Sequence, residues 1–279
     1  MPRVVSSLLI TVWLWLAAFP VAAEPGVTIP VLFDLKRKID RPDLGSLRQI
    51  RFLTEDDFPP FHFIGPDGQL TGFEVDLARA LCAELKLACS IQPRRWDVLK
   101  DSLLGGQGDA IIAALRITAE ARREMAFSAP YFRNPARFVT RRSAPFSDAA
   151  AATLSGRLVT VVEHSAHEAF LKSVFPGAVL RPVADAATAL DQIGAGGVDF
   201  AFVDGVAAAF FLNGEASREC CRFVGGPYLD NRYFGEGSGI AVARGNTRLV
   251  QALDWALHRL AADGTYATLY LKYFPVGIY

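Results

Sequence analysis

The residues of this chain that could do chemistry fall where predicted strands end and predicted helices begin. Asp204 directly follows residues 198–203, an apolar run that predicts a buried central strand. A carboxylate in that position must be paired or solvated. Ser165 opens the sequence Ser-Ala-His-Glu, a capping box at a helix start whose free backbone N–H groups suit a carboxylate. Together the two positions fit the opposite charges of a zwitterion, although each residue could equally be a plain helix cap.

An acidic turn and two aromatic residues form a second group of candidates. Glu55, Asp56 and Asp57 would make the mouth of a cleft negative, which favours cationic ligands. For Asp56 and Asp57 a solvated turn is the simpler interpretation. Phe58 stands between these acids and two prolines, a poor setting for a core residue, and Trp96 opens a predicted helix. Either ring could contact a ligand and accept a cation over its face, or be simple core.

The first part of the chain predicts an α/β unit that would position these residues. Strands are predicted at 49–53, 89–92 and 109–115, and helices at 73–87, 96–104 and 119–125. The strands deliver polar or aromatic residues at their carboxyl ends. In an open α/β sheet that edge is where small ligands sit.

A second α/β unit follows a crossing near residues 134–142. Its strands are predicted at 158–162, 178–183 and 198–203, the chain returns through glycine-rich residues 233–239, and a helix at 248–262 closes the first unit. The predicted fold class is therefore α/β with two domains, 49–134 with 236–279 and 135–235, and two crossings that form a hinge. Residues 24–48, rich in proline and charge, are expected to be an extension laid on the surface or partly disordered.

Composition and the first residues indicate an exported protein. Arg3, the apolar run 4–18 and the small-residue pattern ending at Ala23 predict a signal peptide over 1–23 that is removed near Ala23. The apolar run is shorter than the roughly 20 residues of a membrane span. The 29 basic and 29 acidic residues cancel, which argues against a nucleic-acid binder or a membrane-surface protein.

The order of motifs resembles a known family. Leu70-Thr-Gly-Phe-Glu-Val-Asp-Leu77, Gly108-Asp-Ala-Ile-Ile112 and Phe127-Ser-Ala-Pro-Tyr131 resemble the periplasmic solute-binding proteins of polar amino-acid ABC transporters, family 3, in particular those for histidine and for lysine, arginine and ornithine. The resemblance runs from about Arg51 to the end of the chain. It implies a type II periplasmic binding protein with a ligand cleft between its domains. It also implies a monomer that binds a polar, cationic amino acid without a cofactor and delivers it to a membrane permease with a separate ATPase.

The resemblance assigns a role to each candidate. Asp204 matches the aspartate that binds the ligand's amine, and Ser165 the residue that binds its carboxylate. Phe58 and Trp96 match the aromatic positions that sandwich the ligand's side chain. Glu55 matches an aspartate that meets a basic side chain. His167 falls where relatives use a glutamine to touch the ligand.

One departure from the family pattern concerns the arginine that grips the ligand's carboxylate in relatives. Ala121 stands at that position in Arg116-Ile-Thr-Ala-Glu-Ala-Arg122. Arg122 comes one residue later, about 100° around a helix. Arg116 lies where relatives have a serine or threonine that touches the ligand. We favour Arg116 as the replacement for the family arginine, and Arg122 remains an alternative. A ligand without an α-carboxylate would explain the change equally well.

Four cysteines in an exported chain favour disulfides. The histidine-binding relatives carry a bridge at the spacing of Cys82 and Cys89, so the resemblance implies this pair. Cys220 and Cys221 are adjacent and would either form a strained ring or remain buried free thiols.

Other function classes are less well supported. An enzyme built from Ser165, Asp204 and His164 or His167 lacks the strained elbow of a nucleophilic serine. A metal site from His164, His167 and Glu163 or Glu168 lacks a fixed ligand spacing. We therefore expect no catalytic residues and no metal. A remaining alternative keeps the fold but makes the protein a periplasmic sensor, or an accessory protein of a dehydrogenase, with a ligand that is not an amino acid.

Overall fold

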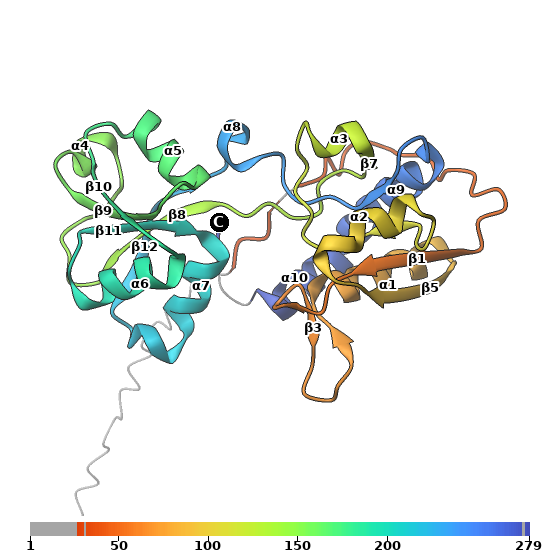
Figure 1. Ribbon diagram of the computed structural model, residues 1–279, viewed down its shortest axis with the longest axis horizontal. Coiled ribbons are helices and arrows are strands. Elements are labelled where there is room, and N and C mark those ends of the chain that lie inside the picture. Colours follow the sequence, from red (N-terminus) through yellow and green to blue (C-terminus); the bar gives the residue numbers. More distant parts are fainter. Residues whose placement is uncertain (1–26, 31, 275–276) are drawn as a thin grey trace, which may run out of the picture.

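The computed structural model describes residues 27–30, 32–274 and 277–279. It has two lobes joined by narrow crossings, and each lobe is built around a five-stranded sheet (Figure 1). The predicted signal peptide lies outside the described residues. None of the helices in the described part of the chain is long and apolar enough to cross a membrane.

The first domain has a mixed sheet in the order β5-β1-β6-β13-β7. β1, β5 and β6 are parallel, and β13 pairs antiparallel with both β6 and β7. The strands are β1 (Gln49–Thr54), β5 (Ala88–Pro93), β6 (Ala110–Ile111), β7 (Met125–Phe127) and β13 (Ala241–Ala243), and a separate small sheet holds β2 (Asp57–Phe58), β3 (His62–Ile64) and β4 (Leu70–Thr71). The helices are α1 (Phe73–Leu85), α2 (Trp96–Leu104), α3 (Ala121–Glu124), α9 (Thr247–Ala262) and α10 (Thr265–Tyr273).

Two predicted elements of this domain are wrong in extent. The strand predicted at 109–115 is paired only at Ala110–Ile111, because the chain then turns at Ala114, whose φ of 49° is left-handed. The helix predicted at 119–125 ends at Glu124, since Met125 already belongs to β7. The other predicted strands and helices of this domain are confirmed to within about two residues.

The second domain has the sheet order β10-β9-β11-β8-β12, with the first three strands parallel and the last two pairings antiparallel. The strands are β8 (Ala136–Arg141), β9 (Leu158–Val162), β10 (Val179–Val183), β11 (Phe200–Asp204) and β12 (Cys221–Tyr228). The helices are α4 (Ala151–Leu154), α5 (Ala166–Val174), α6 (Ala186–Ala195), α7 (Gly205–Asn213), the 3₁₀ turn η1 (Glu215–Ser217) and α8 (Asn231–Phe234). β11 is buried throughout until Asp204, as its apolar sequence predicts.

The chain passes between the lobes twice, once between β7 and β8 and once between α8 and β13 (Figure 1). The last residues of the chain lie at this hinge as well. The Arg137 guanidinium on β8 donates to the Ile278 carbonyl oxygen at 2.8 Å, and the Tyr279 hydroxyl donates to the Arg133 carbonyl oxygen. Ile278 is buried in the first domain's core. The tail therefore contacts both sides of the hinge.

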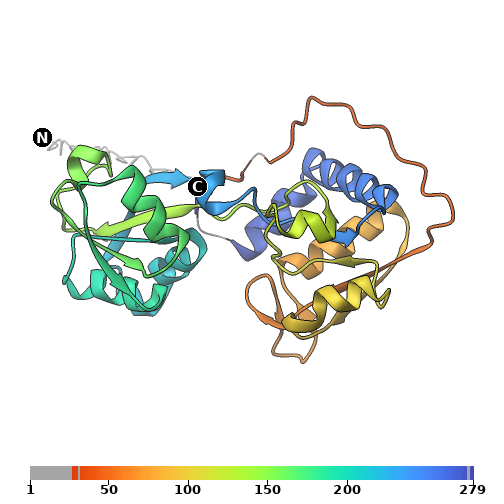
Figure 2. The same cartoon turned by 45° about the horizontal axis from the view of Figure 1, so that its top comes forward.

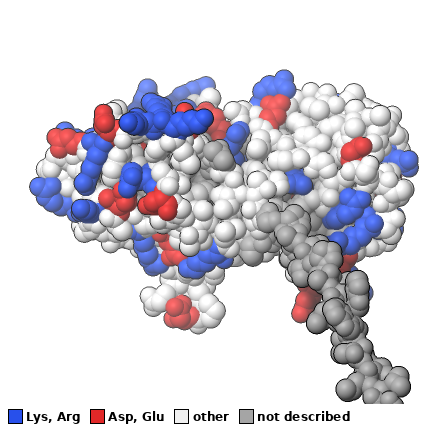
Figure 3. All heavy atoms as spheres, turned by 180° about the vertical axis from the view of Figure 1, so that it is seen from behind, with Lys and Arg blue, Asp and Glu red and all other residues white. Residues whose placement is uncertain are grey.

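The N-terminal extension is laid on the first domain, one of the two states expected from its sequence. It runs around the outside of that domain (Figure 2). Apolar residues of the extension, among them Ile29, Phe33 and Ile39, pack against the core that α1, α9 and α10 enclose. Lys and Arg gather along the upper side of this domain with acidic side chains among them, so the visible face carries both signs of charge (Figure 3).

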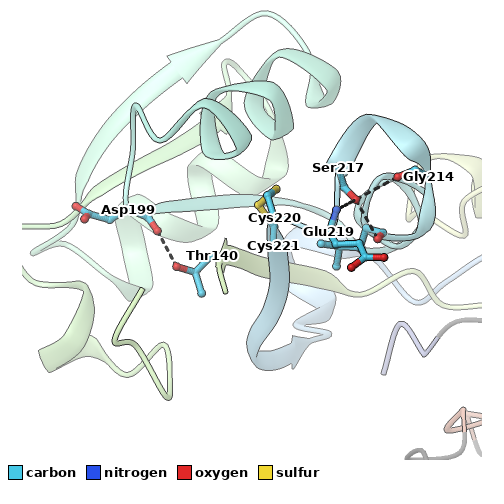
Figure 4. Close-up of a disulfide and its surroundings, with 8 residues drawn as sticks. Thr140, Asp199, Gly214, Ser217, Glu219, Cys220 and Cys221 are labelled. Carbon is cyan, nitrogen blue, oxygen red and sulfur yellow. Dashed lines mark hydrogen bonds between the residues drawn. A yellow bond between two sulfur atoms is a disulfide. The ribbon is translucent and has the colours of Figure 1, made fainter. Parts of the chain in front are cut away.

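Both cysteine pairs are joined. The Cys82–Cys89 disulfide, which ties α1 to β5, is confirmed. Cys220 and Cys221 also form a disulfide, which decides between the two states left open for them. Figure 4 shows this pair at the start of β12, beside the turn in which the Ser217 hydroxyl accepts the Glu219 N–H at 3.1 Å.

Candidate functional site

A cleft of about 430 Å³ opens between the two domains. The first domain and its crossing strand contribute apolar and aromatic residues together with one cation, and the second domain contributes helix starts and one carboxylate. The cleft is lined by Phe58, Phe61, Ala114, Arg116, Phe132, Asn134, Ser165, Ala166, His167, Asp204, Phe234, Gly237 and Ser238. Arg116, Ser165, His167, Asp204 and Phe58, which sequence reasoning named, thus share one cavity.

Asp204 lies at the carboxyl end of β11 and caps α7. Its carboxylate accepts the Ala207 N–H at 2.9 Å and an N–H of the Asn134 side chain. Asn134 in turn accepts the Val206 N–H at 3.3 Å, so it links the hinge to the start of α7. Asp204 keeps some exposure to the cleft, yet desolvation raises its pKa above the ordinary aspartate value. A cation bound beside it would relieve this cost.

Ser165 caps α5 through the capping box predicted from the sequence. Its hydroxyl accepts the Glu168 N–H at 3.1 Å and donates to the Val162 carbonyl oxygen at 2.6 Å, while Glu168 accepts the His164 N–H at 2.8 Å. The hydroxyl is therefore already used within the helix start. The first N–H groups of an α-helix have no partner within the helix. Those of Ala166 and His167, which line the cleft, are thus placed to receive an anion.

His167 is a neutral member of the cleft. Its ring lies against Phe202 and Phe234, with centroid distances of 5.7 and 5.2 Å. Burial, together with the nearby Arg116 charge, lowers the pKa of His167 to about 4. Near neutral pH the ring therefore offers hydrogen bonding and apolar contact, and it adds no charge.

The two arginine candidates have different surroundings. Arg116 follows β6, bridges to Ser238 on the returning crossing and lines the cleft. Its guanidinium has no hydrogen-bond partner among the described residues, whereas the Arg122 guanidinium on α3 donates to Glu236 at 2.8 and 3.3 Å. Arg122 is not among the residues that line the cleft.

The aromatic candidates are also separated. Phe58 stacks on Phe61 with ring centroids 5.4 Å apart and faces the cleft. Trp96 is 53% exposed and lines a different, smaller hollow on α2. Glu55 accepts the Trp96 backbone N–H at 3.2 Å, and neither Glu55 nor Trp96 is among the residues that line the cleft.

A buried carboxylate supports this wall of the cleft. Glu74 on α1 is fully buried and accepts the Ala114 N–H at 2.8 Å, the Tyr131 hydroxyl and the His62 Nδ1–H at 2.7 Å. Burial and the adjacent Glu74 hold the pKa of Tyr131 well above its ordinary value, so Tyr131 remains a donor. Glu74 thereby fixes the left-handed turn at Ala114 and ties the cleft wall to the hinge.

Sequence reasoning missed several lining residues, including Asn134, Phe132, Phe234 and Ser238. Asn134 and Phe132 lie on the first crossing, and Phe234 and Ser238 lie on or beside the second. Both crossings were recognised in the sequence, so polar and aromatic residues within them were the available signal.

Comparison with known proteins places the chain in a family. Residues 50–276 match the model of bacterial extracellular solute-binding proteins, family 3. The chain belongs to this family. Among curated members, it is 35% identical over 225 residues to the "putative ABC transporter arginine-binding protein 2" of Escherichia coli, covering 81% of this chain and 90% of that protein. It is 34% identical over 242 residues to the "L-arginine-binding protein" of Pseudomonas aeruginosa, covering 85% and 92%.

Solved structures of family members indicate how the two lobes of this binding protein are arranged. The L-cystine solute receptor of Neisseria gonorrhoeae, in its unliganded open conformation, gives a TM-score of 0.74 at 25% identity over 84% of this chain and 95% of that one. An ancestral arginine-binding protein bound to arginine gives 0.54 at 30% identity over 81% and 98%. The arginine-bound protein is thus more similar to this chain in sequence identity, but it has the lower TM-score. The structure is therefore more similar to that of the unliganded open receptor than to that of the arginine-bound protein.

Proposed function

We propose that this chain is the receptor of an ABC uptake system, exported to the periplasm after cleavage near Ala23, and that its ligand is an amino acid with a cationic side chain. The names of its relatives, which bind arginine, histidine or lysine, arginine and ornithine, support this ligand class. They give no support to the alternative of a sensor or accessory protein with another kind of ligand. The permease and ATPase would be separate chains, and the receptor itself would act as a monomer without catalytic activity.

The observation that carries the proposal is the pair of opposite charges facing one cleft. Arg116 from the first domain has no hydrogen-bond partner among the described residues, and Asp204 from the second is a desolvated carboxylate. An α-amino acid carries the complementary charges within a few ångströms of each other. Its carboxylate would bind Arg116 and the N–H groups that begin α5. Its ammonium would bind Asp204.

Binding would also close the lobes. Arg116 belongs to the first domain, whereas Asp204 and Ser165 belong to the second, so a ligand that contacts all three stabilises the closed state over the open one. The aromatic wall of Phe58, Phe61 and Phe132 would then pack against the ligand's side chain, and His167 would add a neutral contact.

A thermal-shift titration tests the proposal. The purified mature chain is heated with arginine, lysine, ornithine, histidine or glutamine at rising concentrations. The melting temperature should rise with the concentration of a ligand, as expected when a ligand binds only the folded state. Asp204→Ala should abolish the rise. No response to any amino acid would overturn the proposal, and an unchanged response in the variant would remove Asp204 from the site.

A further inference from the structure

Asn134 on the first crossing makes two hydrogen bonds with the start of α7. Its side-chain N–H donates to the Asp204 carboxylate, and its side-chain oxygen accepts the Val206 N–H at 3.3 Å. An ionised carboxylate only accepts and a backbone N–H only donates, so these two partners fix which way the Asn134 amide faces. Asn134 therefore presents a donor to Asp204 within the cleft that both residues line.

The backbone on either side keeps these groups in register. Ala136 pairs with Asp204 in the antiparallel ladder between β8 and β11, and the Gly205 N–H donates to the Pro135 carbonyl oxygen at 2.7 Å. A Cβ atom at Gly205 would lie only 2.7 Å from the same oxygen, so this close approach requires a glycine. The first crossing and the start of α7 thus form one hydrogen-bonded unit at the hinge.

The Asn134 donor also compensates for the desolvation of Asp204. One oxygen of the carboxylate accepts the Ala207 N–H at 2.9 Å, and the other accepts from Asn134. Desolvation raises the pKa of Asp204, and both of these hydrogen bonds oppose that rise. A donor on each oxygen restricts rotation of the carboxylate as well. Asp204 is thereby ionised and oriented before a ligand arrives.

We propose that Asn134 is a positioning residue of the ligand site: from the hinge it holds the Asp204 carboxylate in the orientation that receives the ligand's ammonium. The proposal rests on the proposed function, since it takes Asp204 as the group that binds the ammonium. Asn134 acts through Asp204 and need not touch the ligand. Its removal therefore weakens binding only while Asp204 carries its charge.

A double-mutant cycle tests whether Asn134 acts through Asp204. Arginine dissociation constants are measured by calorimetry at pH 7 on wild-type protein, Asn134→Ala, Asp204→Asn and the double variant. We expect Asn134→Ala to weaken binding about tenfold in the wild-type background, the loss of one hydrogen bond to a charged group. In the Asp204→Asn background the same substitution should change affinity less than about twofold. Equal losses in both backgrounds, or no loss in either, would overturn the role of Asn134.

Asn213→Ala is the matched control on the same helix. The Asn213 side chain donates to the Ala209 carbonyl oxygen at 2.8 Å, and Asn213 is not among the residues that line the cleft. The control removes a hydrogen bond of α7 but none of Asp204, so arginine affinity should stay within about twofold. A loss as large as that of Asn134→Ala would mean that any disturbance of α7 weakens binding, which would overturn the specific role of Asn134.

The pH dependence of binding is a readout that a purely structural role would not change. Asp204 attracts an ammonium only when it is ionised, so affinity should fall as pH decreases through the Asp204 pKa. Removal of the Asn134 donor raises that pKa further. The loss of arginine binding in Asn134→Ala should therefore begin at a higher pH than in wild-type protein. Curves that coincide after scaling to their values at pH 7 would contradict the proposal.

Other ionisable groups near Asp204 do not change between the two proteins. Among the described residues that line the cleft, these are Arg116 from the first domain and His167 on α5, whose pKa is lowered to about 4. On the neighbouring β8, the Arg137 guanidinium donates to the C-terminal tail. The titration of His167 contributes equally to both curves, so the displacement between them reports on Asp204.

A measurement on the unaltered protein covers the case in which Asn134→Ala fails to fold. With ¹⁵N-labelled asparagine, the side-chain amide resonances of Asn134 should shift as Asp204 takes up its proton at acid pH. Bound arginine should move that shift to lower pH, because an ammonium beside Asp204 favours the ionised form. Amide resonances that do not respond to pH, in a protein that binds arginine, would overturn the inference.

The outcomes separate this inference from the proposed function. Wild-type protein that binds no amino acid would overturn the proposed function and the inference with it. Wild-type protein that binds arginine no more tightly than Asn134→Ala does would overturn the inference alone and leave an amino-acid receptor intact.

Discussion

Arg122 is paired with Glu236: Nη2 lies 2.8 Å from one carboxylate oxygen and Nε lies 3.3 Å from the other. This two-point contact joins α3 to the crossing that leads back into the first domain. Arg116 has no such partner among the described residues and lines the cleft. The two arginines that the sequence left open are therefore in different electrostatic states, and Arg116 is the one available to a ligand.

Substitution of each arginine should separate these states. Arg116→Ala should weaken amino-acid binding by roughly 10- to 100-fold, since a charged contact to the ligand's carboxylate is lost. Arg122→Ala removes a half-exposed ion pair and should leave affinity within about twofold. Calorimetric titration of both variants with the preferred amino acid checks this. A larger loss in the Arg122 variant would reverse the assignment.

Asp204→Asn should stabilise the ligand-free protein while weakening ligand binding. Asparagine is also a good helix cap, and it removes the desolvated charge. We expect the ligand-free variant to melt at a higher temperature at pH 7, because desolvation disfavours the charged form of Asp204 and raises its pKa. Amino-acid affinity should fall at least about tenfold, because the ammonium loses its charged partner. Melting curves and titrations on one preparation measure both effects.

The pH dependence of this variant's stability tests the direction of the Asp204 pKa shift. The folded-state pKa of Asp204 is raised, so wild-type protein loses stability from this group as pH rises from the unfolded value of about 3.9 through the folded value. The stability advantage of Asp204→Asn should therefore grow over that range. Asp185 caps α6 but its pKa is lowered, chiefly by the Thr188 N–H. Asp185→Asn should show the opposite trend, and parallel trends would contradict the argument.

Features of the site that depend on local sequence were predictable. The capping box at Ser165 and the apolar strand before Asp204 depend on residues within one turn or one strand, and both are confirmed. The Cys82–Cys89 bridge followed from the family resemblance and is also confirmed. Local patterns of this kind need no knowledge of how the two domains are arranged.

Features that depend on distant residues were not predictable. β6 ends early because Glu74, 40 residues before Ala114, binds the Ala114 N–H and turns the chain. The Arg122 guanidinium is paired because Glu236, 114 residues later in the chain, lies beside it. No periodicity or cap in the local sequence carries this information. The same limit explains why Asn134 was not singled out, since its partners Asp204 and Val206 lie about 70 residues later.

Glu74→Gln should be strongly destabilising. A glutamine amide would turn donor groups toward the Ala114 N–H, the Tyr131 hydroxyl or His62, all of which are donors to the present carboxylate. An unsatisfied buried group of this kind typically costs about 1–3 kcal/mol. Chemical denaturation checks the change in free energy of unfolding.

Glu124→Gln is the matched control for this prediction. Glu124 is half-exposed and pairs with Lys100 at 2.8 Å on the surface. Its loss should change stability by less than about 0.5 kcal/mol. If the two substitutions change the free energy of unfolding equally, the buried hydrogen bonds of Glu74 stabilise the fold no more than a surface ion pair does.

The hinge tail gives a last prediction. Deletion of Ile278 and Tyr279 removes the carbonyl oxygen that accepts from the Arg137 guanidinium. Arg137 is only 7% exposed, and its Nε has no hydrogen-bond partner among the described residues. The deletion should lower the free energy of unfolding by about 2–4 kcal/mol, from an uncompensated buried cation and lost packing of Ile278. Denaturation curves of the truncated chain measure this loss.

A second substitution in the truncated chain distinguishes the two causes. Arg137→Met removes the buried charge but keeps a long apolar side chain against Phe223, over whose ring the guanidinium lies at 4.3 Å. If the uncompensated cation dominates, Arg137→Met should restore part of the lost stability in the truncated chain while having little benefit in the full-length one. If packing dominates, Arg137→Met should change the free energy of unfolding equally in the truncated and full-length chains. The tail would then stabilise the fold by the burial of Ile278 alone, with no electrostatic role at the hinge.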